Sequence, residues 1–280
     1  MAARQYIDKI ISRLGSEKGT IHKSHADRLR FAIAFPNTYF VGMSNLGFQT
    51  VYGLLNALDD VVCERVFLPD PSDMEDACRI KTGLFTMESQ TPVHDFDVLG
   101  FSLSYELDYP NALSIMRMSG IPERSAERMG SNYPLIIAGG PAVTFNPEPL
   151  APFVDAFIIG EAEGVISDLA DRLLTNRDAG KADQLKLLAQ VPGVYVPSLY
   201  TPVYDEDGTF VRMEVCEGAP ERVRKQWVRD LDEHPTTTVI LTPETEFSNM
   251  VLSEIARGCG RQCRFCAAGY TYLPPRRRSH

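Results

Sequence analysis

Long apolar runs are absent from this sequence. No stretch approaches the roughly eighteen uninterrupted apolar residues of a membrane-spanning helix. The N-terminal stretch MAARQYIDKIISRLG is broken by charges and lacks the apolar core of a signal peptide. Basic residues are outnumbered, and the formal net charge of -9 argues against nonspecific affinity for nucleic acid. We therefore expect a soluble cytoplasmic protein that binds neither membranes nor nucleic acid.

Cysteine is sparse and unevenly distributed. Three of the six cysteines fall within eight residues. Because thiols stay reduced in the cytoplasm, clustered cysteines predict metal ligands or catalytic groups before disulfides. The clustered residues are Cys259, Cys263 and Cys266. The others, Cys63, Cys78 and Cys216, are scattered, and we expect them to be small buried apolar side chains.

Apolar runs of strand length alternate with helical patterns in the first part of the chain. The runs cover residues 29–35, 97–104, 134–140 and 155–160, with a weaker run at 61–67. They show little apolar–polar alternation, which is typical of strands buried on both faces of a parallel sheet. Helices are expected at 4–14, 45–58, 108–120 and 161–174. This order predicts an α/β fold with a doubly wound, Rossmann-like parallel sheet.

The character of the sequence changes after the last of these helices. Strand-like pieces flank the turn signal DEDG at 205–208, which predicts a hairpin. The segment 221–233 is polar and is expected at the surface, whereas 236–242 and 249–257 resemble strands. We divide the chain into an α/β domain (1–185), a β-rich connector (186–249) and the opening of a second domain (250–280).

The clustered cysteines have the spacing C-x3-C-x2-C and follow a predicted buried strand that ends at Arg257. Gly258 and Gly260 would let the chain wrap tightly after that strand. Such a loop can place three thiolates around one iron–sulfur cube. Ordinary electron-transfer clusters usually have four protein ligands, so one iron would stay open to a substrate or cofactor.

A structural zinc site is the alternative for these thiols. Such a site is closed by four ligands. The fourth would have to be Cys216, His234, His280 or a distant residue, because no second C-x2-C pair is present.

With Phe265 at its aromatic position, the stretch SEIARGCGRQCRFC resembles the C-x3-C-x-aromatic-C motif of radical SAM enzymes. The resemblance implies that Cys259, Cys263 and Cys266 hold a [4Fe–4S] cluster and that Phe265 lies near the adenine of S-adenosylmethionine. It also implies that an electron from the cluster cleaves the sulfonium to give methionine and a 5′-deoxyadenosyl radical. A radical enzyme needs a cofactor to generate the radical and a barrel that excludes water.

The α/β part resembles the cobalamin-binding-type domain that precedes the barrel in many radical SAM proteins. The stretches PNTYFVGMSNLGFQTVYGLLN, GFSLSYELDYPNALSIM and GGPAVTFNPEPLAPFVDAFIIGEAE carry this resemblance. Ligands of such sheets bind at the carboxyl ends of the strands. The expected crevice residues are Gly42, Ser44, Gly47, Gly139 and Gly140. The alternative is that these glycines only form turns between strands and helices.

One feature departs from the cobalamin-binding pattern. No D-x-H-x-x-G motif, which would supply a histidine ligand to cobalt, follows the first strand. DEHPTT at 232–237 imitates the motif by coincidence, and His22, His25 and His94 are expected in solvated loops. Cobalamin would therefore bind without a histidine ligand or not at all.

Two charged groups have ordinary interpretations. Glu161 and Glu163 are expected at a helix N-terminus, where the helix dipole favours acidic residues. The run Arg276–Arg278 is expected in a solvated loop, with phosphate contact as the alternative.

The leading interpretation is a radical SAM iron–sulfur oxidoreductase of the B12-binding type. Its electron donor would be a flavodoxin or ferredoxin, and no catalytic or substrate-binding residue is identifiable beyond the cluster. The alternatives are a methylthiotransferase-like modification enzyme and a noncatalytic corrinoid or iron–sulfur module. Because a barrel needs well over a hundred residues, 250–280 would hold only its first strand and cluster loop. We therefore expect a truncated product or a fragment that is inactive alone.

Overall fold

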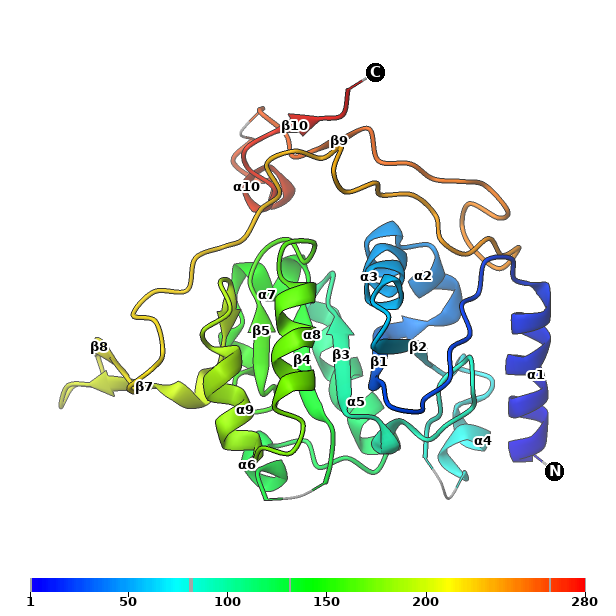
Figure 1. Cartoon of the computed structure of the whole chain (residues 1–280), viewed down its shortest axis with the longest axis horizontal. Helices are drawn as coiled ribbons and strands as arrows, with labels where there is room; N and C mark the ends of the chain where they lie inside the picture. Colours follow the sequence, from blue (N-terminus) through cyan, green and yellow to red (C-terminus); the bar gives the residue numbers. More distant parts are fainter. Residues whose placement is uncertain (1, 81–82, 131, 262, 280) are drawn as a thin grey trace.

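A six-stranded sheet forms the centre of the molecule, and its strands lie in the order β2-β1-β3-β4-β5-β6 (Figure 1). The computed structural model describes residues 2–80, 83–130, 132–261 and 263–279. The strands are β1 (Leu29–Thr38), β2 (Val61–Leu68), β3 (Val98–Ser102), β4 (Leu135–Gly139), β5 (Ala156–Ile158) and β6 (Val194–Tyr195). The first five strands are parallel, and β6 pairs antiparallel with β5. The predicted α/β fold with a mostly parallel sheet is confirmed.

Helices cover both faces of the sheet. The longer ones are α1 (Ala2–Ser16), α3 (Leu46–Ala57), α5 (Tyr109–Met118), α8 (Ile166–Thr175) and α9 (Lys181–Leu188). Shorter ones are α2 (Tyr39–Met43), α4 (Met74–Cys78), α6 (Ser125–Arg128), α7 (Pro141–Phe145) and α10 (Ala268–Thr271). Single 3-10 turns are η1 (Val93–Asp95), η2 (Glu106–Asp108), η3 (Glu148–Leu150) and η4 (Pro197–Leu199). None of these helices is long and apolar enough to cross a bilayer, within the part of the chain that is described.

Strand β1 shows why the apolar runs lack alternation. Phe31 and Ile33 pack into one buried cluster together with α3 and α8. Ala32 and Ala34 point to the opposite face and join a second cluster with α5 and α7. Successive side chains of a strand point to opposite faces, so a strand covered on both sides is apolar throughout.

Local signals fix where the helices start. Asn45 precedes α3, and its side chain accepts a hydrogen bond from the Phe48 N–H at 2.9 Å. This capping satisfies one of the free donors of the first turn. Pro110 lies in the first turn of α5, where its missing N–H costs nothing. Helix α8 starts later than expected, at Ile166, which leaves Glu161 and Glu163 in the preceding turn.

The edge strand β2 is buried along its whole length. Arg65, which is fully buried on β2, forms ion pairs with Glu17 at 2.7 Å and Glu88 at 2.6 Å. These contacts bring the segments after α1 and before η1 over the edge of the sheet. Cys63 is buried here as predicted, whereas Cys78 and Cys216 are exposed, so that prediction is wrong for the latter two.

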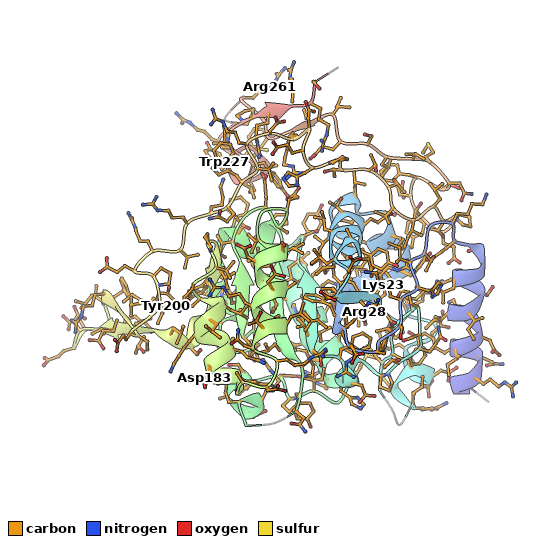
Figure 2. The ribbon with its side chains drawn as sticks, in the orientation of Figure 1. Lys23, Arg28, Asp183, Tyr200, Trp227 and Arg261 are labelled. Carbon is orange, nitrogen blue, oxygen red and sulfur yellow. The ribbon has the colours of Figure 1, made fainter. Side chains whose placement is uncertain are left out.

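The predicted hairpin is present. It consists of β7 (Tyr200–Tyr204) and β8 (Phe210–Val215), which pair antiparallel around the DEDG turn. Figure 1 shows it projecting from the sheet, and Figure 2 shows Tyr200 at its base. The sheet strand β6 lies beyond residue 185, in the segment assigned to the connector. The division into domains stays a prediction.

The segment after the hairpin runs across the top of the sheet in Figure 1. The predicted buried strand at 250–257 is wrong in extent and burial. Only β9 (Ala256–Arg257) is a strand, paired with β10 (Arg276–Arg277), and Ile255 is 80% exposed. These residues have one short partner strand instead of a sheet that would bury them. The expected strand at 236–242 is limited to isolated bridges, at Thr237 and at Leu241.

Candidate functional site

A cavity of about 670 Å³ lies at the carboxyl ends of the parallel strands. Its walls are formed by residues 44–47, where α2 meets α3, and by residues at the ends of β3, β4 and β5, namely Ser102, Ser104, 139–141 and 160–163. The cysteine-bearing segment contributes a further wall, at Glu254, 256–258 and 271–272. The neighbouring strands β1 and β3 connect to opposite sides of the sheet, which makes this edge the topological switch point where ligands of open α/β sheets bind.

The inner end of the cavity is apolar. Phe31, Ile33 and Ile137 line it from the sheet, and side chains of α3 and α8 line it from the side. Gly100 also lines this end. A Cβ at Gly100 would lie 2.4 Å from the Phe31 ring, so the ring can lie here only because residue 100 has no side chain. This end of the cavity suits an uncharged, apolar group.

Four of the five predicted crevice residues line the cavity: Ser44, Gly47, Gly139 and Gly140. Gly140 has a φ of +113°, and a Cβ there would lie 2.4 Å from the Leu103 carbonyl oxygen. Gly42 does not line the cavity. A Cβ on Gly42 would lie 2.4 Å from the Phe67 ring, so this glycine allows α2 to pack closely against β2.

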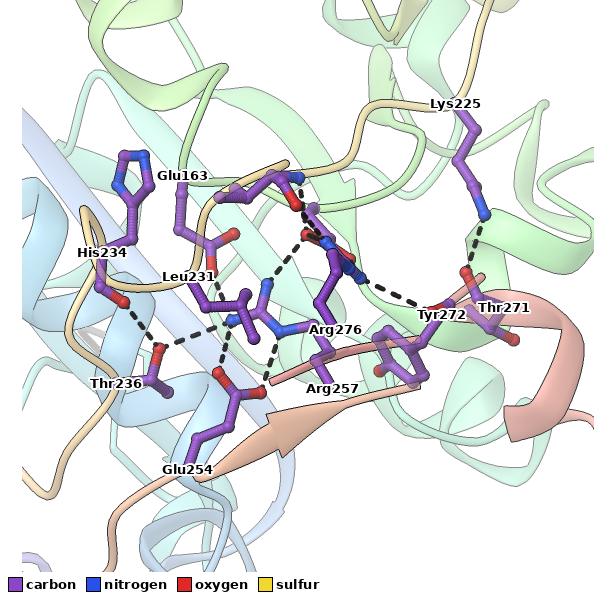
Figure 3. Close-up of polar contacts among 12 residues, drawn as sticks. Glu163, Lys225, Leu231, His234, Thr236, Glu254, Arg257, Thr271, Tyr272 and Arg276 are labelled. Carbon is purple, nitrogen blue, oxygen red and sulfur yellow. Dashed lines mark hydrogen bonds and ion pairs between the residues drawn. The ribbon is translucent and has the colours of Figure 1, made fainter. Parts of the chain in front are cut away.

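Glu161 lines the cavity and is the hub of an ion-pair cluster, in which its partners are Arg257 and Arg276, both labelled in Figure 3. Its carboxylate accepts hydrogen bonds from Arg276 at 2.5 and 2.8 Å and from the Val228 N–H at 2.8 Å. Arg257 lies 2.9 Å from the same carboxylate. Burial would raise the pKa of Glu161, but these bonds and the charge of Arg257 outweigh it and lower the pKa.

Arg257 connects three carboxylates. Besides Glu161, it pairs with Glu163 at 2.7 Å and with Glu254 at 2.8 Å. Arg278 binds Glu254 from the other side at 3.1 Å. Every charged group named on this wall therefore has an opposite partner, and the cavity offers no free charge from this cluster to a ligand.

Two sequence-based interpretations are corrected here. Glu161 and Glu163 bind arginines and do not lie at a helix N-terminus. Arg276 and Arg278 are only 8% and 15% exposed in their side chains and form ion pairs, so the run is not a solvated loop. No local pattern could reveal pairs that join residues about a hundred positions apart.

The cysteine loop, residues 258–275, is closed at its base. Arg257 faces Arg276 in the β9–β10 ladder. Gly258 has a φ of +83°, and a Cβ there would lie 2.2 Å from the Tyr272 carbonyl oxygen, so only glycine fits this close crossing. Lys225 donates to the carbonyls of Thr271 and Leu273 at 2.9 and 3.2 Å.

The three clustered thiols lie in this loop. All are free; Cys259 is exposed, and Cys263 and Cys266 are half-buried. Phe265 is 93% exposed. Among the described residues, which exclude Gln262, no three His, Cys, Asp or Glu side chains are arranged as a metal-binding group. As a donor set, three thiolates fit an iron–sulfur cluster.

A family model described as the N-terminal region of radical SAM proteins matches residues 47–197. An uncharacterised protein of Methanocaldococcus jannaschii is 28% identical over 250 residues, which cover 88% of this chain and 42% of that protein. The chain thus spans less than half the length of this curated relative.

Two solved structures of TsrM, a radical S-adenosylmethionine methyltransferase from Kitasatospora setae, are also similar in outline. One holds tryptophan and the analogue aza-SAM, with a TM-score of 0.46 and 12% identity over 90% of this chain and 43% of that chain. The other holds cobalamin and a [4Fe–4S] cluster, with a TM-score of 0.47 and 14% identity over 90% of this chain and 44% of that chain.

Proposed function

The chain belongs to the radical SAM proteins, through the N-terminal region that defines its family, and on that premise we propose that it is part of an iron–sulfur enzyme that uses S-adenosylmethionine. Cys259, Cys263 and Cys266 would hold a [4Fe–4S] cluster. When bound, such a cluster supplies the electron that cleaves S-adenosylmethionine. The family match ends at residue 197, so the assignment of the thiols is supported by their spacing and by their place in one closed loop.

The residues around the thiols support this role. The loop base is held by β9–β10 and by Lys225, while the thiols face outward or are half-buried. A cluster with three protein ligands keeps one iron open, which S-adenosylmethionine would occupy. Phe265 is exposed and available to pack against the adenine. A flavodoxin or ferredoxin would deliver the electron to this surface.

The cavity is the proposed corrinoid site. The observation that carries this proposal is that the strand-end loops and the cysteine segment line the same cavity. A volume of about 670 Å³ suits a drug-sized ligand or one part of a larger one. No histidine is among its described lining residues. Cobalamin would therefore bind through apolar contacts and close backbone approach, without a histidine on cobalt.

The proposed cluster function is tested by spectroscopy on the full chain. After anaerobic reconstitution with iron and sulfide and reduction with dithionite, the electron paramagnetic resonance spectrum is recorded with and without S-adenosylmethionine. We expect S-adenosylmethionine to change the g-values, because it would bind the open iron. If S-adenosylmethionine leaves the g-values of the reconstituted cluster unchanged, the result would favour the noncatalytic iron–sulfur module.

The corrinoid proposal has its own variant pair. A Cβ on Gly139 would keep ordinary distances, with its nearest neighbour at 3.7 Å, so Gly139→Val would fold and fill part of the cavity. Gly130→Val is the control, since no atom lies near Gly130. We expect Gly139→Val to weaken hydroxocobalamin binding at least about tenfold, as one bulky clash costs more than about 1.4 kcal/mol. Equal binding by both variants would place the corrinoid elsewhere.

The methylthiotransferase-like alternative is less well supported. It calls for three additional N-terminal cysteines. The α/β part, residues 1–185, contains two cysteines, one fewer than such a set needs: Cys63, which is buried in β2, and Cys78, which is exposed in α4.

A further inference from the structure

The Glu161 carboxylate, at the end of β5, binds both strands that close the cysteine loop, β9 and β10. Arg257 and Arg276 are direct partners in the β9–β10 ladder, and both reach Glu161. Glu161 follows β5 and is only 8% exposed. Its backbone N–H also donates to the Gln226 carbonyl at 3.0 Å. Glu161 is therefore the residue at which three parts of the chain meet: the β9–β10 ladder, the 226–228 segment and the end of β5.

We propose that Glu161 is a positioning residue that docks the cysteine loop onto the carboxyl ends of the sheet. A buried carboxylate without its cations is strongly unfavourable, so Glu161 holds the two arginines in place as long as it is charged. Glu163 adds a second, weaker contact, because it pairs with Arg257 alone among the arginines of the cluster.

The docking places the loop and the cavity in contact through consecutive residues. Arg257 and Gly258 line the cavity, and Cys259 follows directly. A ligand in the cavity and a group on the thiols would therefore share one short stretch of backbone. Coupling between two sites is reciprocal, so a change at either would alter binding at the other.

This inference rests on the proposed function only for what the thiols and the cavity bind. The docking itself is a property of the metal-free chain and is tested there.

The test is hydrogen–deuterium exchange of the full metal-free chain. Glu161→Gln keeps the shape of the side chain and removes its charge. We expect peptides from 254–279 to exchange at least about tenfold faster, while peptides from β1, β3 and β4 stay unchanged. Glu163→Gln should accelerate exchange in the same region by a smaller factor. If Glu161→Gln folds poorly, Glu163→Gln takes its place as the test variant.

The matched control is Asp97→Asn. Asp97 also pairs with two arginines, Arg30 at 2.7 Å and Arg177 at 3.5 Å, but it precedes β3 at the opposite end of the sheet. The Asp97→Asn variant should leave the exchange rate of peptides from 254–279 unchanged. The inference is overturned if Glu161→Gln leaves 254–279 protected, or if it accelerates exchange equally throughout the chain.

Iron content, measured on reconstituted samples of the same proteins, separates this inference from the proposed function. Local acceleration in Glu161→Gln with no iron bound by the wild type would support docking and contradict the cluster. Bound iron with an unaffected 254–279 segment would support the cluster and overturn the docking.

Discussion

Glu161 and Arg276 form a two-point ion pair with separations of 2.5 and 2.8 Å, although 115 positions separate them in the sequence. Both side chains are largely shielded, at 7% and 8% exposure. The pair fixes the segment that carries the cysteines against the edge of the sheet where the cavity opens. The following predictions test the parts of this arrangement.

Gly140→Ala should destabilise the protein strongly. Its φ of +113° favours glycine, and a Cβ would lie 2.4 Å from the Leu103 carbonyl oxygen. We expect a loss of about 2–4 kcal/mol in the free energy of unfolding, measured in urea. The adjacent Gly139→Ala is the control and should cost less than about 1 kcal/mol, since its Cβ would meet only ordinary contacts. Equal losses in the two variants would contradict the geometry of this turn.

Gly258→Ala should loosen the cysteine loop without unfolding the sheet. The substitution forces the Tyr272 carbonyl away at the base of the loop. Arg261, which lies at the outer side of the loop in Figure 2, provides a trypsin site. We expect cleavage there to be about tenfold faster, because backbone strain of about 1–3 kcal/mol favours opening.

Gly260→Ala is the matched control for that experiment. The nearest atom to its Cβ would be the Pro275 Cγ at 3.6 Å, so the loop should keep its shape. Comparable cleavage rates for both variants would show that the base of the loop does not depend on Gly258.

The docking of the cysteine segment should be lost in acid. The pKa values of Glu161 and Glu254 lie below 4.5: burial alone would raise them, but bonds from Arg276 and Arg257, respectively, outweigh that effect. A lowered folded-state pKa contributes stability that is fully present above pH 4.5 and disappears as the pH falls through the folded value.

Trp227 reports this transition. It is the one tryptophan of the sequence and is labelled in Figure 2. The Arg276 guanidinium lies 5.5 Å from its ring centre. We expect its emission to change below pH 4.5 at a higher pH than the loss of far-ultraviolet circular dichroism. In Glu161→Gln the emission change should already be present at neutral pH. Coincident changes in both signals would mean that the segment unfolds only with the sheet.

Bound corrinoid should carry no histidine on cobalt. The cavity has no histidine among its described lining residues, and His25 bonds Glu64 at 2.7 Å on the covered sheet edge. The Co(II) form should give the same electron paramagnetic resonance splitting in unlabelled protein and in protein labelled with ¹⁵N-histidine. A splitting pattern that changes with the label would contradict this prediction.

The sequence predicted best those features that depend on local pattern. The apolar runs marked all five parallel strands, and even the weak run at 61–67 is strand β2. The complete burial of β2 could not be predicted from the sequence, because Glu17 and Glu88 reach Arg65 from distant segments.

The candidate site was only partly predictable for the same reason. Turn glycines after strands predicted a ligand crevice, and Gly140 lines the cavity at these strand ends, while its contact with a ligand stays a prediction. Gly42 has the same local appearance but serves packing against Phe67, which only the tertiary structure shows. The ion pairs of Glu161 with Arg257 and Arg276 join segments whose spacing in sequence carries no signal.

The most direct test of the central claim is the iron content of cysteine variants after anaerobic reconstitution. The wild type should hold about four irons and four sulfides per chain. Cys259→Ala, Cys263→Ala and Cys266→Ala should each lose the cluster absorbance and most of the iron. Cys78→Ala, which removes another exposed thiol, should keep both. A Cys263→Ala protein with full iron content, or a Cys78→Ala protein without iron, would contradict the assignment of the cluster to this loop.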